Sequence, residues 1–290
     1  MIQDIFPHKL SIEYKNDVCA DADSLLMVFN GRNLLCSMAE DGTLTLPVCG
    51  QADGFENGVL PGADLTYFFA LDGRSVFYAR NAKNIEINGF EYKDINLFRT
   101  AQPREMAYAA VTGYHFSNWY ACNAFCGRCG EKTEHDGVER MMRCPKCGNM
   151  IFPKIMPSVI VGVINGDRIL LEQYNRPGAK LGALVAGFTE IGETVEETVI
   201  REVKEECGLD VGRLRFYKTQ PWGISGGGLL CGFWCEVTGD DTIHPDGVEI
   251  ADAQWVTRRW LKENYVDTGI SLTGEMIAAF RDGKEKDINA

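Results

Sequence analysis

The chain of 290 residues is long enough for two or three domains, and its 45% hydrophobic and 24% charged residues are those of an ordinary globular protein. A net charge of −12 argues against broad binding to nucleic acids, which depends on a basic surface. No apolar run approaches the roughly 20 residues that a membrane-spanning helix needs, and the first residues lack the pattern of a signal peptide. We therefore expect no membrane partner and a cytoplasmic location.

The N-terminal part of the chain is predicted to be rich in β-strands. Apolar runs flank the turn dipeptides Asn30-Gly31 and Asp72-Gly73, which predicts two hairpins, at 25–38 and 65–78. A helix is expected at 103–120, because its first residue is a proline, which is favoured in a first helical turn. No catalytic pattern is present here, so packing or dimerisation is the expected role.

Two matched pairs of cysteines follow. Two residues separate Cys126 from Cys129 and Cys144 from Cys147, and fourteen residues lie between the pairs. This spacing is typical of a zinc ribbon, in which four thiolates surround one structural Zn²⁺ and leave no position for a substrate. A redox dithiol is the weaker alternative, since both pairs match. The other seven of the 11 cysteines show no disulfide spacing and are expected to be reduced.

A helix with a clear start and end is predicted within the segment 187–209. Thr194 and Glu197 are spaced as a capping box, in which each side chain bonds the backbone of the other residue. Gly208 suits the left-handed residue that ends a helix. The helix should therefore span about Thr194 to Cys207.

Three carboxylates crowd one side of this helix. Glu202, Glu205 and Glu206 would repel one another unless a cation lies between them. Arg201 can neutralise one of them. A hard divalent ion such as Mg²⁺ or Mn²⁺, which prefers carboxylate oxygens, could bind the others.

The whole segment resembles the Nudix box, the signature of hydrolases that act on a nucleoside diphosphate linked to another moiety. All nine fixed positions of that pattern are filled, by Gly187, Glu193, Arg201, Glu202, Val203, Glu205, Glu206, Gly208 and Leu209. The resemblance implies that Glu202, Glu205 and Glu206 bind two or more catalytic divalent ions, while Glu193 and Arg201 brace the loop against the helix. It also implies two further metal ligands, the carbonyl of Ala186 and the side chain of Glu249.

The order of zinc ribbon, Nudix box and the run Thr219-Gln220-Pro221-Trp222 resembles the NADH pyrophosphatase branch of the family, over roughly residues 95–285. The resemblance implies a homodimer that splits the pyrophosphate of NADH, NAD⁺ or the NAD cap of RNA, releasing nicotinamide mononucleotide and AMP or 5′-phosphorylated RNA. It assigns substrate contacts to Glu139, Phe152, Gln220, Pro221, Trp222, Gly223, Ile224, Ser225 and Thr273.

One departure from the branch affects selectivity. Where relatives carry Pro-Phe-Pro, this chain has Gly223-Ile224-Ser225, so an aromatic ring that could stack on a base is absent. Base–aromatic stacking is worth roughly 1–3 kcal/mol. Two alternatives therefore stay open: a Nudix pyrophosphatase that acts on ADP-ribose or a dinucleoside polyphosphate, and a non-catalytic nucleotide-binding regulator.

The expected fold is mixed α+β in three parts: a β-rich domain with a closing helix at 1–120, the zinc ribbon at 121–152 and a Nudix domain at 153–290. In the last part, strands are expected at 158–164, 168–174, 214–219 and 229–237, with later helices at 258–265 and 271–281. Together with the helix of the box, these elements fit the α/β/α sandwich of the Nudix fold.

Overall fold

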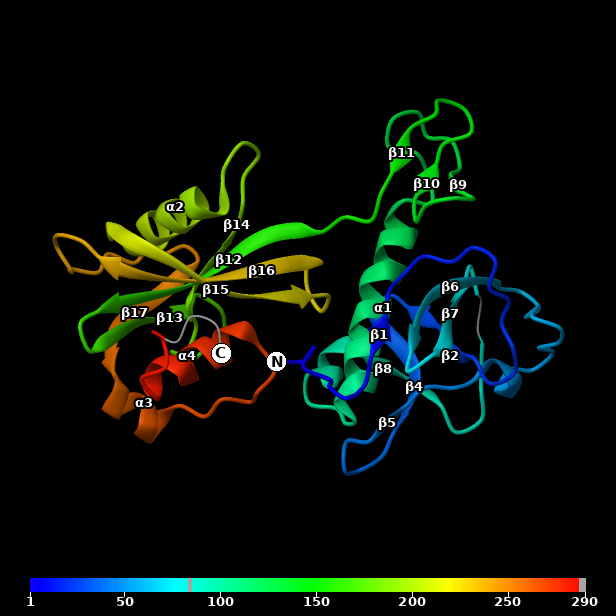
Figure 1. Cartoon of the computed structure of the whole chain (residues 1–290), viewed down its shortest axis with the longest axis horizontal. Helices are drawn as coiled ribbons and strands as arrows, with labels where there is room; N and C mark the ends of the chain where they lie inside the picture. Colours follow the sequence, from blue (N-terminus) through cyan, green and yellow to red (C-terminus); the bar gives the residue numbers. More distant parts are fainter. Residues whose placement is uncertain (83–84, 287–290) are drawn as a thin grey trace. The chain divides into compact units, whose positions relative to one another are not determined.

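The structure is a computed structural model that describes residues 1–82 and 85–286 (Figure 1). The chain forms two compact units: the N-terminal unit, with Ile2–Lys154 and Gly223–Gly227, and the C-terminal unit, with Met1, Ile155–Trp222 and Gly228–Ala290. The division into three domains stays a prediction. Across the described residues, no helix has the length and apolar character needed to cross a bilayer.

Short strands of the N-terminal unit form two four-stranded sheets. The first has the order β1-β6-β7-β2, with bounds Leu10–Ser11, Asp64–Leu71, Arg74–Arg80 and Leu25–Met27. The second contains β3, β4, β5 and β8, with bounds Phe29–Asn30, Asn33–Met38, Leu44–Thr45 and Glu91–Asp94. Two 3₁₀ turns, Cys49–Gln51 and Ile95–Arg99, complete the connections.

One predicted hairpin is confirmed, and the other is confirmed only next to its turn. β6 and β7 pair around Asp72 and Gly73, whose φ angles of 51° and 80° suit a tight turn. At 25–38, by contrast, only Phe29–Asn30 pairs with β4, while Leu25–Met27 runs parallel to β7. All three residues of β2 are buried, as is typical of a strand that is covered on both faces. Burial therefore outweighs the local turn signal.

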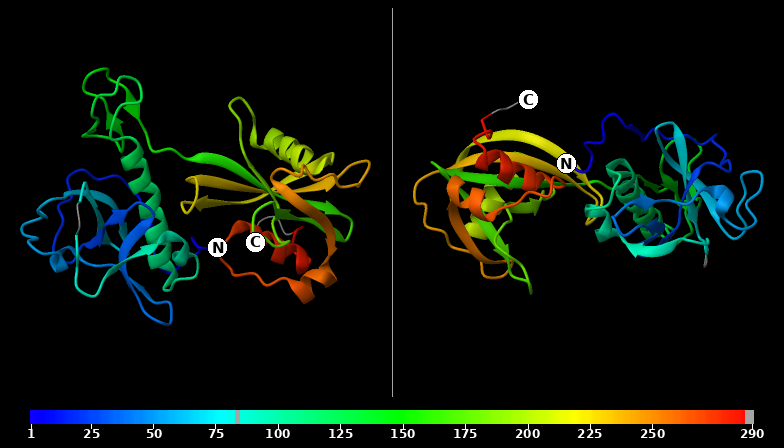
Figure 2. Two further views of the ribbon diagram at one scale, coloured as in Figure 1. Left: turned by 180° about the vertical axis from the view of Figure 1, so that it is seen from behind. Right: turned by 90° about the horizontal axis from the view of Figure 1, so that it is seen from below.

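Helix α1, Arg104–Cys122, lies beside these strands (Figures 1 and 2), close to the predicted range. A Cβ at Gly113 would overlap the sulfur of Met27, so glycine permits the close approach of the helix to β2. The zinc-ribbon segment follows with β9, β10 and β11, at Glu134–His135, Met142–Arg143 and Met150–Ile151. Arg140 ties it to the first sheet by donating to the carbonyl of Phe68 over 2.6 Å.

A six-stranded sheet forms the centre of the C-terminal unit, in the order β15-β16-β12-β13-β17 with β14 beside β12. The parallel pair is β12 with β16, and the other pairs are antiparallel. In chain order, β12 to β17 span Met156–Asn165, Arg168–Tyr174, Val185–Phe188, Val211–Trp222, Gly228–Val237 and Ile250–Thr257.

Helices cover both faces of this sheet (Figures 1 and 2). On one face, α2 buries Val199 and Val203 in a core with Val159 and Val161 of β12. On the other, α3 and α4 pack against a second core that includes Trp234. The expected α/β/α sandwich is confirmed, with helix bounds Val195–Cys207, Arg258–Asn264 and Leu272–Arg281.

His135 in β9 should make the N-terminal unit sensitive to acid. Its ring stacks on Tyr120 with centroids 5.0 Å apart, and its Nε2 is buried with no hydrogen-bond partner in the described chain. Burial, with Arg80 nearby, lowers the pKa of His135 to about 4. The unfolded chain, with a pKa of about 6.5, takes up the proton first, so stability is full at neutral pH and is lost as the pH falls from about 6.5 to 4.

We therefore expect urea unfolding of the protein to show a steeper loss of stability between pH 7 and pH 5 than His135→Phe, which keeps a ring but cannot be protonated. The readout is the unfolding midpoint by tryptophan fluorescence. Parallel curves for the two proteins would show that His135 is not the group responsible.

Candidate functional site

Helix α2 begins and ends as the sequence predicts. The hydroxyl of Thr194 accepts from the N–H of Glu197 over 3.2 Å, and the carboxylate of Glu197 accepts from the N–H of Thr194 over 2.8 Å. Gly208 ends the helix with a φ of 72°. This capping fixes the first and last turns, and hence the direction in which each acidic side chain of α2 points.

Arg201 joins the helix to the loop after β14. Its Nε and Nη2 donate to the two oxygens of Glu193 over 2.6 and 2.9 Å, and Nη2 also donates to the carbonyl of Phe188 over 2.9 Å. Thr198 adds a hydroxyl donor to Glu193 over 3.0 Å. The hydrogen bond from Arg201 is the main reason that the pKa of Glu193 falls to about 2. Glu193 therefore stays ionised and holds the loop in place.

The other donor of the guanidinium, Nη1, serves two more carboxylates. It donates to Glu202 over 2.7 Å and to Glu205 over 3.0 Å. The Glu202 side chain is 12% exposed, whereas that of Glu205 is 60% exposed. A Cβ at Gly187 would overlap the carboxylate of Glu202, so only glycine lets β14 pass this close to α2.

Glu206 lies deeper and has no such cation. It is 5% exposed, accepts a hydrogen bond from the backbone of Ala186, and its Oε2 is buried without a donor among the described residues. Burial raises its pKa, and the neighbouring carboxylates Glu172 and Glu202 raise it further. The carboxyl of Glu206 is thus held where a positive charge would be stabilising.

The sequence analysis missed Glu172. This residue of β13 is fully buried, and the thiol of Cys207 donates to its Oε1 over 3.0 Å. Its carboxyl group also interacts directly with that of Glu206. The sequence contains an indication of it. Residues two apart on a strand share a face, and Glu172 lies between Leu170 and Tyr174, both of which pack in the core beside α2.

Glu249 belongs to the same acidic group. Its negative charge contributes to the raised pKa values of Glu202 and Glu206. The loop before it is held by Asp246, whose carboxylate accepts from the N–H groups of Glu249 and Ile250. The site therefore gathers carboxylates from α2 and from the loop before β17, with the Glu193–Arg201 pair at one side.

These groups fit a hard divalent cation. Among the described residues, Oε2 of Glu206 is buried without a donor, and the carboxylates of Glu172, Glu202 and Glu249 are near enough to raise the pKa of Glu206. Mg²⁺ and Mn²⁺ bind such oxygens, and their charge would relieve the repulsion that raises the pKa of Glu206.

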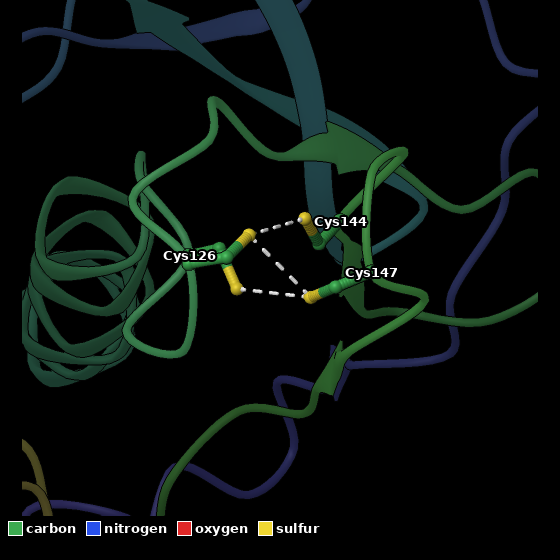
Figure 3. A group of neighbouring side chains, drawn as sticks. Cys126, Cys144 and Cys147 are labelled. Carbon is green, nitrogen blue, oxygen red and sulfur yellow. Dashed lines mark hydrogen bonds between the residues drawn. The ribbon is translucent and has the colours of Figure 1, made fainter.

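The predicted zinc ligands lie together in the N-terminal unit, and Figure 3 labels three of them, Cys126, Cys144 and Cys147. The sulfurs of Cys126, Cys129, Cys144 and Cys147 all lie within 4.8 Å of one another, and in the described part of the chain they are the one group of three or more metal-ligating side chains this compact. Each pair closes in a knuckle, in which the N–H of Gly130 or Gly148 donates to the carbonyl of the first cysteine. The geometry fits a structural Zn²⁺.

The residues predicted to contact substrate lie in several places. Gln220, at the end of β15, is fully buried: its amide donates to the carbonyl of Ile270 over 2.9 Å and accepts from the N–H of Leu272 over 2.7 Å. Its amide thus braces the start of α4. Pro221 is exposed and Trp222 is partly buried.

The loop after Trp222 differs from expectation. Ile224 is completely buried, and it belongs with Gly223–Gly227 to the N-terminal unit, where a Cβ at Gly223 would lie 2.7 Å from the carbonyl of Val111. Ile224 therefore packs in the interior of the N-terminal unit and offers no exposed surface for stacking on a base. Ser225 is exposed, as are Glu139 and Phe152 of the N-terminal unit, and Thr273 in α4 is partly buried.

Comparison with known proteins points to one family. Residues 154–272 match the family model described as the NUDIX domain, and residues 123–152 match the NADH pyrophosphatase zinc ribbon domain. The chain is similar to a protein of Haemophilus influenzae named NAD-capped RNA hydrolase NudC, with 30% identity over 230 residues that cover 68% of this chain and 86% of the relative. A protein of the same name from Vibrio atlanticus is 32% identical over 184 residues, which cover 63% of this chain and 66% of the relative.

The chain thus spans slightly less than two thirds of the length of the first relatives that it matches. Among solved structures, a NUDIX hydrolase from Nitrosomonas europaea is 20% identical, with a TM-score of 0.46 and coverage of 55% of this chain and 93% of that protein.

Replacing Gly187 should disturb the acidic group while the sheet stays intact. In Gly187→Ala, the added methyl group overlaps the carboxylate of Glu202, so we expect that carboxylate to move and Mn²⁺ binding to weaken, with a stability loss of about 1–3 kcal/mol. Titration calorimetry and thermal unfolding measure the two effects. Gly137→Ala is the control, because a Cβ there meets nothing within 4 Å. Equal Mn²⁺ affinity in both variants would contradict this prediction.

Zinc removal should affect only the ribbon. We expect one Zn²⁺ per chain by elemental analysis, and Cys144→Ser should lose it because a three-thiolate site binds the ion far more weakly. Hydrogen exchange should then increase at residues 126–151 while α2 stays protected. Cys122→Ser, which changes an exposed cysteine outside the cluster, should keep its zinc.

Proposed function

The chain belongs to the Nudix hydrolase family, and on that premise we propose that it cleaves the pyrophosphate bond of NADH and NAD⁺, giving nicotinamide mononucleotide and AMP. The observation that carries the proposal is the acidic group held by Arg201 around Glu206, whose buried Oε2 has no donor among the described residues. The NADH pyrophosphatase zinc ribbon and relatives named as NAD-capped RNA hydrolases support the substrate class. The NAD-capped 5′ end of RNA is the second proposed substrate.

Two or more Mg²⁺ or Mn²⁺ ions would be held by the carbonyl of Ala186 and by the side chains of Glu202, Glu205, Glu206 and Glu249. Such ions neutralise diphosphate oxygens and lower the pKa of a bound water. The carboxylates of the chain position these ions. Arg201 keeps Glu202 and Glu205 beside Glu206 by bonding both of them, and Glu193 orients Arg201.

We further assign substrate contacts to the residues that the resemblance to the NADH pyrophosphatase branch implies. Phe152, 49% exposed, offers a ring for stacking, and Trp222 offers a second, partly buried one. Glu139, Ser225 and Thr273 supply polar groups, while Pro221 shapes the strand end. We propose a cytoplasmic homodimer, in keeping with the same branch.

A second candidate substrate class follows from the buried Ile224. Without an exposed ring on the loop 223–227, one source of base stacking is missing, and ADP-ribose or a dinucleoside polyphosphate could be hydrolysed better than NADH. A non-catalytic nucleotide-binding regulator is the third candidate, and it is disfavoured by the complete set of carboxylates.

The test is product analysis by chromatography with Mn²⁺ and four substrates: NADH, NAD⁺, ADP-ribose and a short NAD-capped RNA. We expect NADH to have the highest kcat/KM, and Glu206→Gln to lower it at least about a hundredfold, because the variant weakens the charge that positions the metal. Glu196→Gln, an exposed change on the same helix, is the control. A faster reaction with ADP-ribose would move the assignment to the second class, and nucleotide binding without turnover would favour a regulator.

A further inference from the structure

Strand β13 places one carboxylate where a hydrophobic side chain is expected. Along this strand Leu170, Glu172 and Tyr174 face the core beneath α2, and Leu170 and Tyr174 pack within it. The backbone of Glu172 is satisfied, since its N–H donates to Ala183 and its carbonyl accepts from Gly182 and Ala183. The side chain is 0% exposed. Its carboxyl group thus reaches the interior with no access to water.

The hydrogen bonding of this carboxyl group is incomplete. Oε1 accepts from the thiol of Cys207 over 3.0 Å, which is a weak donor, and Oε2 has no donor among the described residues. Oε2 of Glu206, its neighbour, is buried and lacks a donor as well. Two adjacent buried carboxyl groups with free oxygens are costly unless a cation or a proton joins them.

In the described part of the chain, no basic side chain forms a hydrogen bond or ion pair with Glu172 or Glu206. On α2, Arg201 donates its hydrogen bonds to Glu193, Glu202, Glu205 and the carbonyl of Phe188. The charged groups that raise the pKa of Glu206 are all acidic: Glu172, Glu202 and Glu249. Neither Glu172 nor Glu206 therefore has a positively charged partner among the described residues.

We propose that Glu172 supplies a further carboxylate to the divalent-cation site of Glu206, so that this chain holds the ion from β13 as well as from α2. This inference rests on the metal dependence in the proposed function. Glu172 is the more deeply buried of the pair, at 0% exposed against 5% for Glu206, whereas Glu205, which is bonded to Arg201, has a side chain that is 60% exposed. Its negative charge strengthens the attraction for the cation and limits the positions that the Glu206 carboxylate can adopt.

Metal affinity and metal-free stability together test this role in the zinc-loaded protein of 290 residues. We expect Glu172→Gln to bind Mn²⁺ at least about tenfold more weakly, by calorimetry and by the electron paramagnetic resonance signal of free Mn²⁺. Its thermal midpoint without divalent ions should be equal to or above that of the unaltered protein, because a buried charge has been removed. Glu172→Asp, which keeps the charge, should retain more of the affinity than Glu172→Gln does.

The control is Glu196→Gln, which removes one exposed charge from α2 and should leave the Mn²⁺ affinity unchanged. Unchanged affinity in Glu172→Gln would overturn the inference. A destabilised or unfolded Glu172→Gln would also overturn the inference, because Glu172 would then serve the fold through its hydrogen bond with Cys207 and not the metal site. If the unaltered protein itself showed no saturable Mn²⁺ binding, the metal dependence of the proposed function would be wrong. This result differs from unchanged affinity in Glu172→Gln, which would contradict only the role of Glu172.

Discussion

The guanidinium of Arg201 determines how the acidic groups of this protein are arranged. It pairs with both oxygens of Glu193 and shares Nη1 between Glu202 and Glu205, which locks the loop after β14 onto α2 in a directional way. Its compensating charge ends there. One helical turn beyond Glu202, Glu206 is buried next to other acidic side chains. The acidic group therefore has a compensating positive charge at its outer side, from Arg201, and none at its inner side among the described residues.

Features that depend on short-range chemistry could be predicted from the sequence. The capping box of Thr194, the left-handed Gly208 and the paired cysteines each involve groups a few residues apart, and the structure has each of them as expected. Gly187 is an intermediate case. The pattern requires glycine, but the reason lies across the fold, in the carboxylate of Glu202 that fills the space of a side chain.

Features that depend on distant packing could not be predicted. Leu25–Met27 leaves its local hairpin to lie beside β7, because all three side chains are buried there. The sequence predicts a substrate contact at Ile224. Its loop instead packs near Val111, more than a hundred positions earlier in the chain. Glu172 is the same kind of case: the strand pattern marks a buried position, and only the fold reveals that its neighbour is Glu206.

The two metal sites relate differently to stability. The ribbon has only two-residue strands and a small core, so a zinc ion bound by four thiolates supplies what apolar burial does not. The C-terminal unit has large cores on both faces of its sheet and folds around carboxyl groups that destabilise it. A divalent ion that binds only the folded unit removes this destabilisation by mass action. The apolar cores on both faces of the sheet offset the cost of burying these carboxyl groups, and their raised pKa values favour the protonated form until a divalent ion binds.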